Sequence, residues 1–450
     1  MSVPMPRAAS ATAPSQPQRV RTRPPTAIRA GVKSTELLLT FVLWFLLVYE
    51  VDWFIYVRSG IPVQRIPTLL APMIGLVILM RGGDKRAIHW PLLLFTGMHF
   101  VASLIAENAG LSRTPFKFMV YVVLLFAATV SYLDTAPKMI TLLKLYLVGF
   151  IWFGLQGISD GQVNWHPLLA NTDSYGPLMV ISMPFSYFFA LATTSTRWKW
   201  IARGTFLLSI LGVVVSFARG AVLAAAVVLL YILWRSPHRT KAFTVLMLSG
   251  IVLLPAASLL IPVDAFVTEV ASSTQGDDVR MTLWKLAIRV FNTSPLFGVG
   301  AGNYGVVAAR ILTPDEASSM WGHMYFRPPH MPHLQILAEE GLIGIVLWIS
   351  MIVAFYRWNS RLHRKDTSAI WASSGGKELD LPLIARGLEG AMLGFLGTSI
   401  FYNQLYIHWF WSLLIISFVL SLVTRPTQLA VPPPPGSVSP PRRSRRGGLR

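Results

Sequence analysis

An arginine lies between two long apolar segments of the sequence. Arg219 follows the stretch that ends in Ser216, Phe217 and Ala218, and it precedes Gly220, after which the second apolar segment begins. A charge so close to hydrocarbon is costly and commonly functional. Gly220 permits a sharp turn, and the N-terminus of the following helix favours an anion. Together these features predict a phosphate-binding site. The alternative is an arginine that extends to the lipid headgroups.

Two further arginines, Arg280 and Arg289, occur in a long polar stretch between apolar segments. An arginine stays charged and can hold two phosphate oxygens at once, so both are candidates to bind an anionic substrate. Asp277 and Asp278 could instead pair with Arg280 or cap a helix start. Residues 280–291 predict an amphipathic helix, with apolar residues at helical spacing: Met281, Trp284, Leu286 or Ala287, and Val290 or Phe291.

Three more candidates, Arg327, His330 and His333, come just before another apolar segment. A helix N-terminus lowers the pKa of a nearby histidine, and a neutral imidazole can act as a general base. The pattern therefore predicts a neutral general base near an anionic substrate. The alternative is a histidine that merely lies at the membrane surface. A zinc site at the His-x-x-His pair is disfavoured, because no other ligand cluster accompanies it.

Weaker candidates are spread along the chain. Tyr304 lies in a glycine-rich stretch that starts at Gly298. No strand or βαβ unit surrounds it, so a tight turn or a backbone loop against a ligand is favoured over a nucleotide site. His166 and Asn171 lie in a shorter polar segment and could line the same cavity as the arginines. Four ionisable residues within apolar runs rank lower: His99, Lys144, Glu389 and His408.

The chain that carries these residues has the composition of a membrane protein. Of its 450 residues, 53% are hydrophobic and only 13% are charged, against about 25% charged in soluble domains. The net charge is +19. The basic residues concentrate at both ends and in alternate gaps between apolar segments, which indicates cytoplasmic loops and disfavours nucleic-acid binding. The absence of cysteine excludes disulfides, thiolate catalysis and cysteine-based zinc sites.

Apolar segments long enough to cross a bilayer recur through the sequence. We predict an all-α integral membrane protein with about 12 transmembrane helices, each needing about 20 apolar residues. Placing the basic gaps inside puts both termini in the cytoplasm and the polar segments 157–175 and 263–332 on the outer side. The predicted helices are 35–57, 66–81, 88–106, 116–133, 139–158, 176–196, 198–216, 218–235, 241–262, 333–356, 383–402 and 404–424.

The remaining segments complete the predicted organisation. Residues 1–34 and 425–450 are rich in proline and arginine and cannot bury enough apolar surface, so we expect two disordered cytoplasmic tails. Transmembrane helices 1–9 occupy 35–262 and helices 10–12 occupy 333–424. Between them, the large outer loop 263–332 contains aromatic residues among polar ones, which predicts a partly helical cap on the outer membrane face.

The order of these motifs resembles the O-antigen ligase and O-antigen polymerase family. The resemblance rests on segment 216–220, on Arg280 with Trp284, on segment 295–304, and on His330 followed by 334–344. It implies a glycosyltransferase C-like membrane bundle with one large periplasmic or extracellular loop. It also implies an inverting, metal-independent glycosyltransferase that needs no cofactor.

The resemblance also implies a substrate and a role for each main residue. The donor would be a glycan on undecaprenyl pyrophosphate in the bacterial cytoplasmic membrane. The acceptor hydroxyl would belong to a lipid A core sugar, a second glycan or a protein. Arg219 and Arg280 would hold the pyrophosphate, and His330 would activate or position the acceptor. Met331 stands where the family usually has asparagine, so His333 remains an alternative base.

Other functions stay open at this point. Polymerase and ligase activities are not distinguished by these residues. A transporter or flippase could bind an anionic lipid-linked substrate through the same arginines without turnover. A scaffold for envelope assembly would suit the arginine-rich tails.

Overall fold

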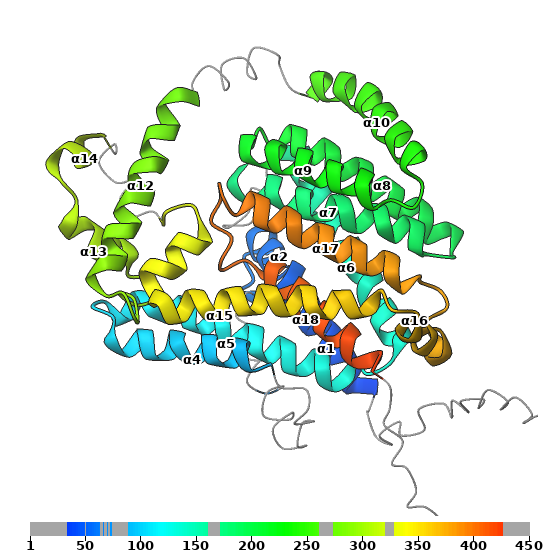
Figure 1. Cartoon of the computed structure of the whole chain (residues 1–450), viewed down its shortest axis with the longest axis horizontal. Coiled ribbons are helices and arrows are strands. Elements are labelled where there is room, and N and C mark those ends of the chain that lie inside the picture. Colours follow the sequence, from blue (N-terminus) through cyan, green and yellow to red (C-terminus); the bar gives the residue numbers. More distant parts are fainter. Residues whose placement is uncertain are drawn as a thin grey trace, which may run out of the picture.

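Helices form nearly all of the described part of this chain, whose structure is a computed structural model. It describes residues 34–49, 51–63, 66, 70, 73, 89–160, 172–260, 273–319 and 328–425. The helices (Figure 1) are α1 Ser34–Tyr49, α2 Val51–Ser59, α4 Trp90–Ile105, α5 Ala109–Tyr132, α6 Ala136–Asp160, α7 Thr172–Ala192, α8 Thr196–Val215, α9 Arg219–Arg235, α10 Arg239–Leu260, α12 Ser273–Thr293, α13 Tyr304–Ile311, α14 Pro314–Ser319, α15 Pro332–Leu362, α16 Lys365–Trp371, the π-helical turn η4 Ala372–Gly376, α17 Leu381–Thr398 and α18 His408–Val423.

The all-α prediction is confirmed for this part of the chain. Five of the described helices, α5, α6, α7, α8 and α15, are long and apolar enough to cross a membrane, and α4 and α18 are shorter apolar helices. The chain is therefore a multi-pass membrane protein. The predicted segment 35–57 is wrong as one helix, because α1 ends at Tyr49 and α2 begins at Val51. The predicted segment 66–81 lies almost wholly outside the described residues, so the total of about 12 stays a prediction.

Helix α7 lies at the centre of the bundle and packs closely on α17. In the apolar stretch of α7, 94% of residues are buried. Three glycines of α17, Gly387, Gly390 and Gly394, face α7, and a Cβ atom on Gly390 would lie 2.6 Å from the Cβ of Pro184. Small residues let two helix backbones approach, which drives association where lipid removes the hydrophobic difference. This contact fixes α17, and hence the connection from α17 to α18.

Helix α12 forms a second small core outside the main bundle. Its buried residues follow helical spacing, and they pack with Tyr304 and Ala308 of α13 and Ala338 of α15. The predicted amphipathic helix is thus confirmed, and it starts earlier than predicted, at Ser273. Its buried face is shifted from the prediction, because Met281 is 50% exposed. The buried residues of α12 are Leu283, Leu286, Ala287 and Val290.

A break divides α15 at Gly341, where φ is 66° and ψ is −161°. A broken helix in lipid leaves backbone amides and carbonyls that the protein itself must satisfy. The segment 295–300 does so on both sides of the break. The hydrogen bonds run from Leu342 N to Pro295 O (2.9 Å), Ile343 N to Leu296 O (3.4 Å), Val299 N to Ala338 O (3.1 Å) and Gly300 N to Glu339 O (2.9 Å).

Glycine is required where these two segments meet. Gly298 has φ +72°, and a Cβ atom there would lie 2.2 Å from the carbonyl carbon of Glu339. A Cβ atom on Gly341 would lie 2.5 Å from the carbonyl carbon of Leu296. The glycine-rich stretch around Tyr304 is therefore a tight turn packed against α15, one of the two interpretations that its sequence allowed.

A Gly298→Ala substitution is expected to destabilise the fold by about 3 kcal/mol, because the left-handed backbone and the collision with α15 both oppose a side chain. Gly60→Ala is the matched control, since Gly60 has φ +70° but nothing within 4 Å of its Cβ position. The control should lose only about 1 kcal/mol. Thermal unfolding of both purified variants measures the difference, and equal losses would contradict the close contact.

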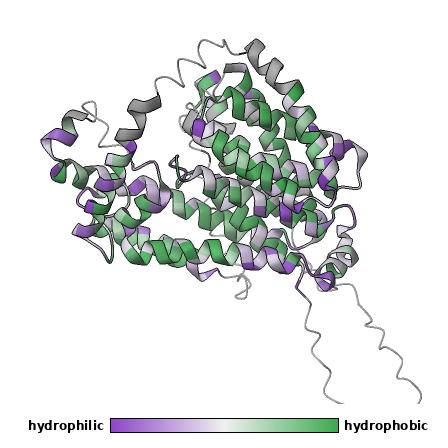
Figure 2. Cartoon of the chain, turned by 45° about the horizontal axis from the view of Figure 1, so that its top comes forward, coloured by the Kyte–Doolittle hydropathy of each residue, from purple (hydrophilic) through white to green (hydrophobic). Residues whose placement is uncertain are grey.

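The bundle has two different ends. At one end the C-terminus of α9 meets α15 and α17: Arg386 donates to the carbonyl of Arg235 at 2.9 Å, and Glu389 lies 2.8 Å from His363. At the other end lie the start of α9, the α17–α18 connection, α12 to α14 and the start of α15 (Figure 1). Hydrophobic residues line the helices between the ends, and hydrophilic residues gather towards both (Figure 2).

Candidate functional site

Tyr402, in the connection between α17 and α18, joins two of the predicted site elements. Its hydroxyl accepts a hydrogen bond from the amide of Gly220 at 3.0 Å. The guanidinium carbon of Arg280 lies 6.0 Å from the centre of its ring, a distance at which a cation is attracted to an aromatic face. Gly220 lies in the first turn of α9 and Arg280 lies in α12. Residues far apart in the sequence therefore meet around one buried tyrosine.

The start of α9 is shaped by this contact. A Cβ atom on Gly220 would lie 2.6 Å from the Cβ of Phe401, so only glycine lets α9 approach the α17–α18 connection so closely. Ala218, the N-cap residue, supplies no side-chain cap. The side chain of Arg219 is exposed at this end of the bundle. A cation and a helix N-terminus thus lie together, as the sequence predicted.

The segment before α15 is attached to the same face of α12. Trp284 follows Arg280 by one helical turn, and such residues share a face. Its indole Nε1 donates to the carbonyl of Pro329 at 3.1 Å. His330 is the next residue and is half-buried. One side of α12 therefore contacts Tyr402, which holds the start of α9, and Pro329, the residue before the predicted base.

The backbone is strained both in the segment before α9 and in the segment before α15. Among the described non-glycine residues, only Phe217 (φ 54°) and His330 (φ 52°) have positive φ. Such residues are uncommon and cluster at functional sites, where surrounding contacts hold them. Phe217 precedes Arg219 by two residues, and His330 is the predicted base. The strain therefore coincides with the two segments that the motifs singled out.

His333 has a different environment from His330. It lies in the first turn of α15, and its ring centre is 6.3 Å from that of Trp348 inside the bundle. Its Nδ1 atom is buried without a hydrogen-bond partner among the described residues. Its neighbours are bundle side chains, whereas His330 adjoins the segment held by Trp284.

Arg289 and Tyr304 make contacts within the polar region. Two oxygens of Glu316 accept hydrogen bonds from Arg289 Nη2 at 2.8 and 2.6 Å, and this arginine holds the pKa of the Glu316 carboxyl below its usual value. Tyr304 is buried and donates to the carbonyl of Leu283 at 3.2 Å, and burial raises its pKa. These contacts connect α12, α13 and α14, and the structure does not bring either residue to Tyr402.

Several sequence candidates cannot be placed. Arg327, His166 and Asn171 lie outside the described residues. The suggestion that Asp277 or Asp278 caps the helix start is wrong, because α12 begins at Ser273. In the part of the chain that the structure describes, no three histidine, aspartate or glutamate side chains group as metal ligands would.

Sequence reasoning missed Tyr402 and the roles of two buried carboxylates. Glu339 accepts from the amide of Tyr304 at 3.3 Å and from Gln335 at 3.0 Å, so it fixes the turn against α15. The carboxylate of Glu340 lies 3.0 Å from Nδ1 of His99. In the sequence, Tyr402 is marked only by the polar pair Asn403-Gln404 between two apolar segments. That pair does not indicate that Tyr402 contacts Gly220 or Arg280.

No curated protein matches the chain. Residues 204–349 match the model of a family described as O-antigen ligase. The matched stretch contains Arg219, Arg280 and His330, whereas Tyr402 lies beyond it. The match supports the resemblance that the motifs carry: residues 204–349, about a third of the chain, are similar to the O-antigen ligase family.

Proposed function

We propose that this protein transfers a glycan from undecaprenyl pyrophosphate to an acceptor hydroxyl on the outer side of the bacterial cytoplasmic membrane, with both termini inside. The family match supports glycan transfer from a lipid-linked substrate. The observation that carries the proposal is the meeting of Arg280 and the start of α9 at Tyr402. It brings the Arg280 guanidinium and the N-terminus of α9, which lie far apart in the sequence, to one tyrosine, and both favour a pyrophosphate.

The leaving group needs the most stabilisation in such a transfer. When the bond to the anomeric carbon breaks, the pyrophosphate leaves with the electron pair and gains charge. Arg219 and Arg280 remain charged throughout, and the α9 N-terminus adds a fixed dipole. Groups held in place before the reaction stabilise this charge without reorganising.

The attacking group is the acceptor hydroxyl. His330 accepts its proton while the hydroxyl oxygen bonds to the anomeric carbon on the face opposite the pyrophosphate. The anomeric configuration is therefore inverted. A general base contributes about 10²–10⁴-fold to such a step. No metal ion takes part in this scheme, and polymerase and ligase differ only in the acceptor.

Reconstitution of the purified protein tests the proposal. The donor glycan on undecaprenyl pyrophosphate is supplied with and without a candidate acceptor, and mass spectrometry follows the glycan product and the released carrier. Product with donor alone would identify a polymerase, and product only with a separate acceptor would identify a ligase. Transfer should survive a chelator. Movement of the donor across the bilayer without product would instead support a flippase.

Tyr402→Phe is expected to lower transfer about tenfold, because the buried amide of Gly220 loses its acceptor, at a cost of about 1–3 kcal/mol, and the α9 start shifts. Tyr187→Phe is the matched control. The hydroxyl of Tyr187 is 3.0 Å from that of Ser236 at the opposite end of the bundle. The Tyr187→Phe variant should lose comparable stability and keep the wild-type rate of glycan transfer. Equal rates for the two variants would remove Tyr402 from the site.

A further inference from the structure

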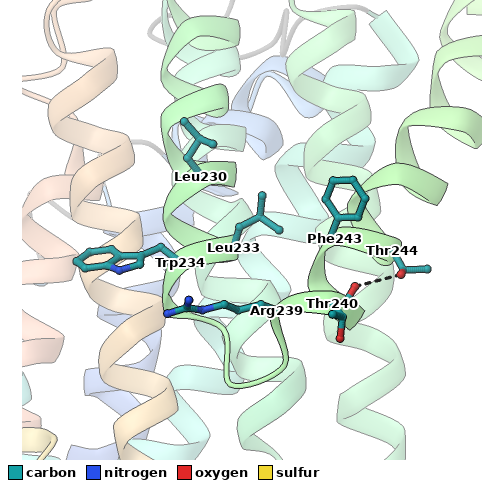
Figure 3. A pocket seen from close by; sticks show the side chains of 7 residues that line it. All are labelled: Leu230, Leu233, Trp234, Arg239, Thr240, Phe243 and Thr244. Carbon is teal, nitrogen blue, oxygen red and sulfur yellow. Dashed lines mark hydrogen bonds between the residues drawn. The ribbon is translucent and has the colours of Figure 1, made fainter.

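A groove runs between α9 and α10 on the outside of the bundle (Figure 3). Its volume is about 680 Å³. Figure 3 shows Leu233 of α9 and Phe243 of α10 on either side, with Arg239 at the turn that joins the helices. Leu230, Trp234 and Phe243 are 66%, 65% and 55% exposed. The complete lining is Leu230, Leu233, Trp234, Arg239, Thr240, Phe243 and Thr244.

A second, more polar cavity adjoins the groove at the turn. It has a volume of about 300 Å³ and shares Trp234 and Arg239 with the groove. Two further arginines, Arg235 and Arg386, also line it. The apolar groove therefore adjoins, at the turn between α9 and α10, a cavity that three arginines line.

The arginines carry more positive charge than their protein partners offset. Glu389 lies 3.3 Å from Arg235, and the same carboxylate also contacts His363 at 2.8 Å. Arg386 donates to a backbone carbonyl, that of Arg235. The Nε atoms of Arg235 and Arg386 are buried without hydrogen-bond partners among the described residues. Among the described residues, Glu389 pairs with one of the three arginines, Arg235. The cavity therefore keeps a positive charge that favours an anion.

We propose that this place binds one anionic phospholipid, with its phosphate in the arginine cavity and an acyl chain in the groove. Charge selects the headgroup, and the apolar side chains Leu230, Leu233, Trp234 and Phe243 of the groove select a lipid over a soluble anion. Basic pockets between transmembrane helices recognise anionic headgroups in this way. The site is separate from glycan transfer. Helix α9 has 17 residues, so its two ends lie about 24 Å apart at 1.5 Å per residue.

Thermal unfolding of the full-length protein in neutral detergent tests this site. Phosphatidylglycerol, phosphatidylcholine and inorganic phosphate are each titrated against the delipidated protein. Phosphatidylglycerol should raise the unfolding temperature in a saturable way, and the other two should not. An equal rise with phosphatidylcholine would exclude charge selection. An equal rise with inorganic phosphate would show a simple anion site. Either result would overturn the proposal.

Two variants assign the effect to these residues. Arg239→Gln should weaken the apparent affinity for phosphatidylglycerol about fivefold, the attraction of one arginine at an anionic surface. Arg357→Gln removes an exposed charge from α15 near the same end and should leave the affinity unchanged. Thr244→Trp fills the groove from an exposed position and should abolish the effect. Unchanged binding by both Arg239→Gln and Thr244→Trp would refute the site.

Discussion

Replacement of Arg280 by alanine is expected to lower the rate of glycan transfer by about 10²–10³-fold, the loss typical of one fixed group that stabilises developing charge. Arg280 lies against Tyr402, whose hydroxyl holds the start of α9, so its charge is placed before the donor binds. The transfer rate of Arg280→Lys should lie between those of the wild type and Arg280→Ala, because lysine keeps the charge but not the planar guanidinium group. Single-turnover rates with the lipid-linked donor measure both.

A second cation on the same helix provides the control. Lys285 is exposed on α12, and Lys285→Ala removes an equal charge. Its transfer rate should stay within about twofold of the wild type, since an exposed charge is screened by salt. Comparable losses in Lys285→Ala and Arg280→Ala would show that general attraction, and not placement beside Tyr402, accounts for the effect.

Replacement of His330 is expected to lower transfer by about 10²–10⁴-fold, the contribution of a general base. Alanine would remove the imidazole and also oppose the positive φ of 52° at this position. Asparagine and glycine tolerate positive φ, so they separate the two effects. If the imidazole carries the proton, all three variants should be inactive while His330→Asn and His330→Gly remain well folded.

The same series distinguishes His330 from His333. Recovery of activity in His330→Asn would assign a conformational role to this position. His333→Ala should keep most of its activity, because His333 packs towards Trp348 within the bundle. Loss of transfer in His333→Ala alone would move the base to that residue and leave the reaction class intact.

The sequence predicted the elements better than their contacts. Hydropathy located the helices because each apolar run is a local property. The helix predicted at 218–235, for example, is α9 Arg219–Arg235. The break between α1 and α2 was missed although Glu50 and Asp52 lie there, because strongly apolar residues flank these two acidic ones and the run 35–57 keeps a high mean hydropathy. Helix α12 was recognised by its periodicity, yet its start at Ser273 has no apolar signal.

The site was predictable only in part, for a related reason. Arg219 stands out because a charged residue beside apolar runs is unusual. Arg280 and His330 stand out through the order of the motifs in the polar stretch that contains them. Tyr402 does not stand out, because its importance comes from Gly220 and Arg280, which are distant in sequence. Arg289 looked equivalent to Arg280, but its side chain is paired with Glu316. Spacing along one helix does not reveal which arginine faces another segment.

The break in α15 restricts insertions and deletions in the segment 295–300 that is hydrogen-bonded to it. Four hydrogen bonds align 295–300 with 338–343, two on each side of Gly341. Inserting one residue into 295–300 would shift this alignment and leave buried amides without acceptors. The connection Leu312-Thr313, between α13 and α14, has no such partner segment among its described backbone contacts. Related chains should therefore differ in length at that connection while keeping the spacing from Pro295 to Gly300 constant.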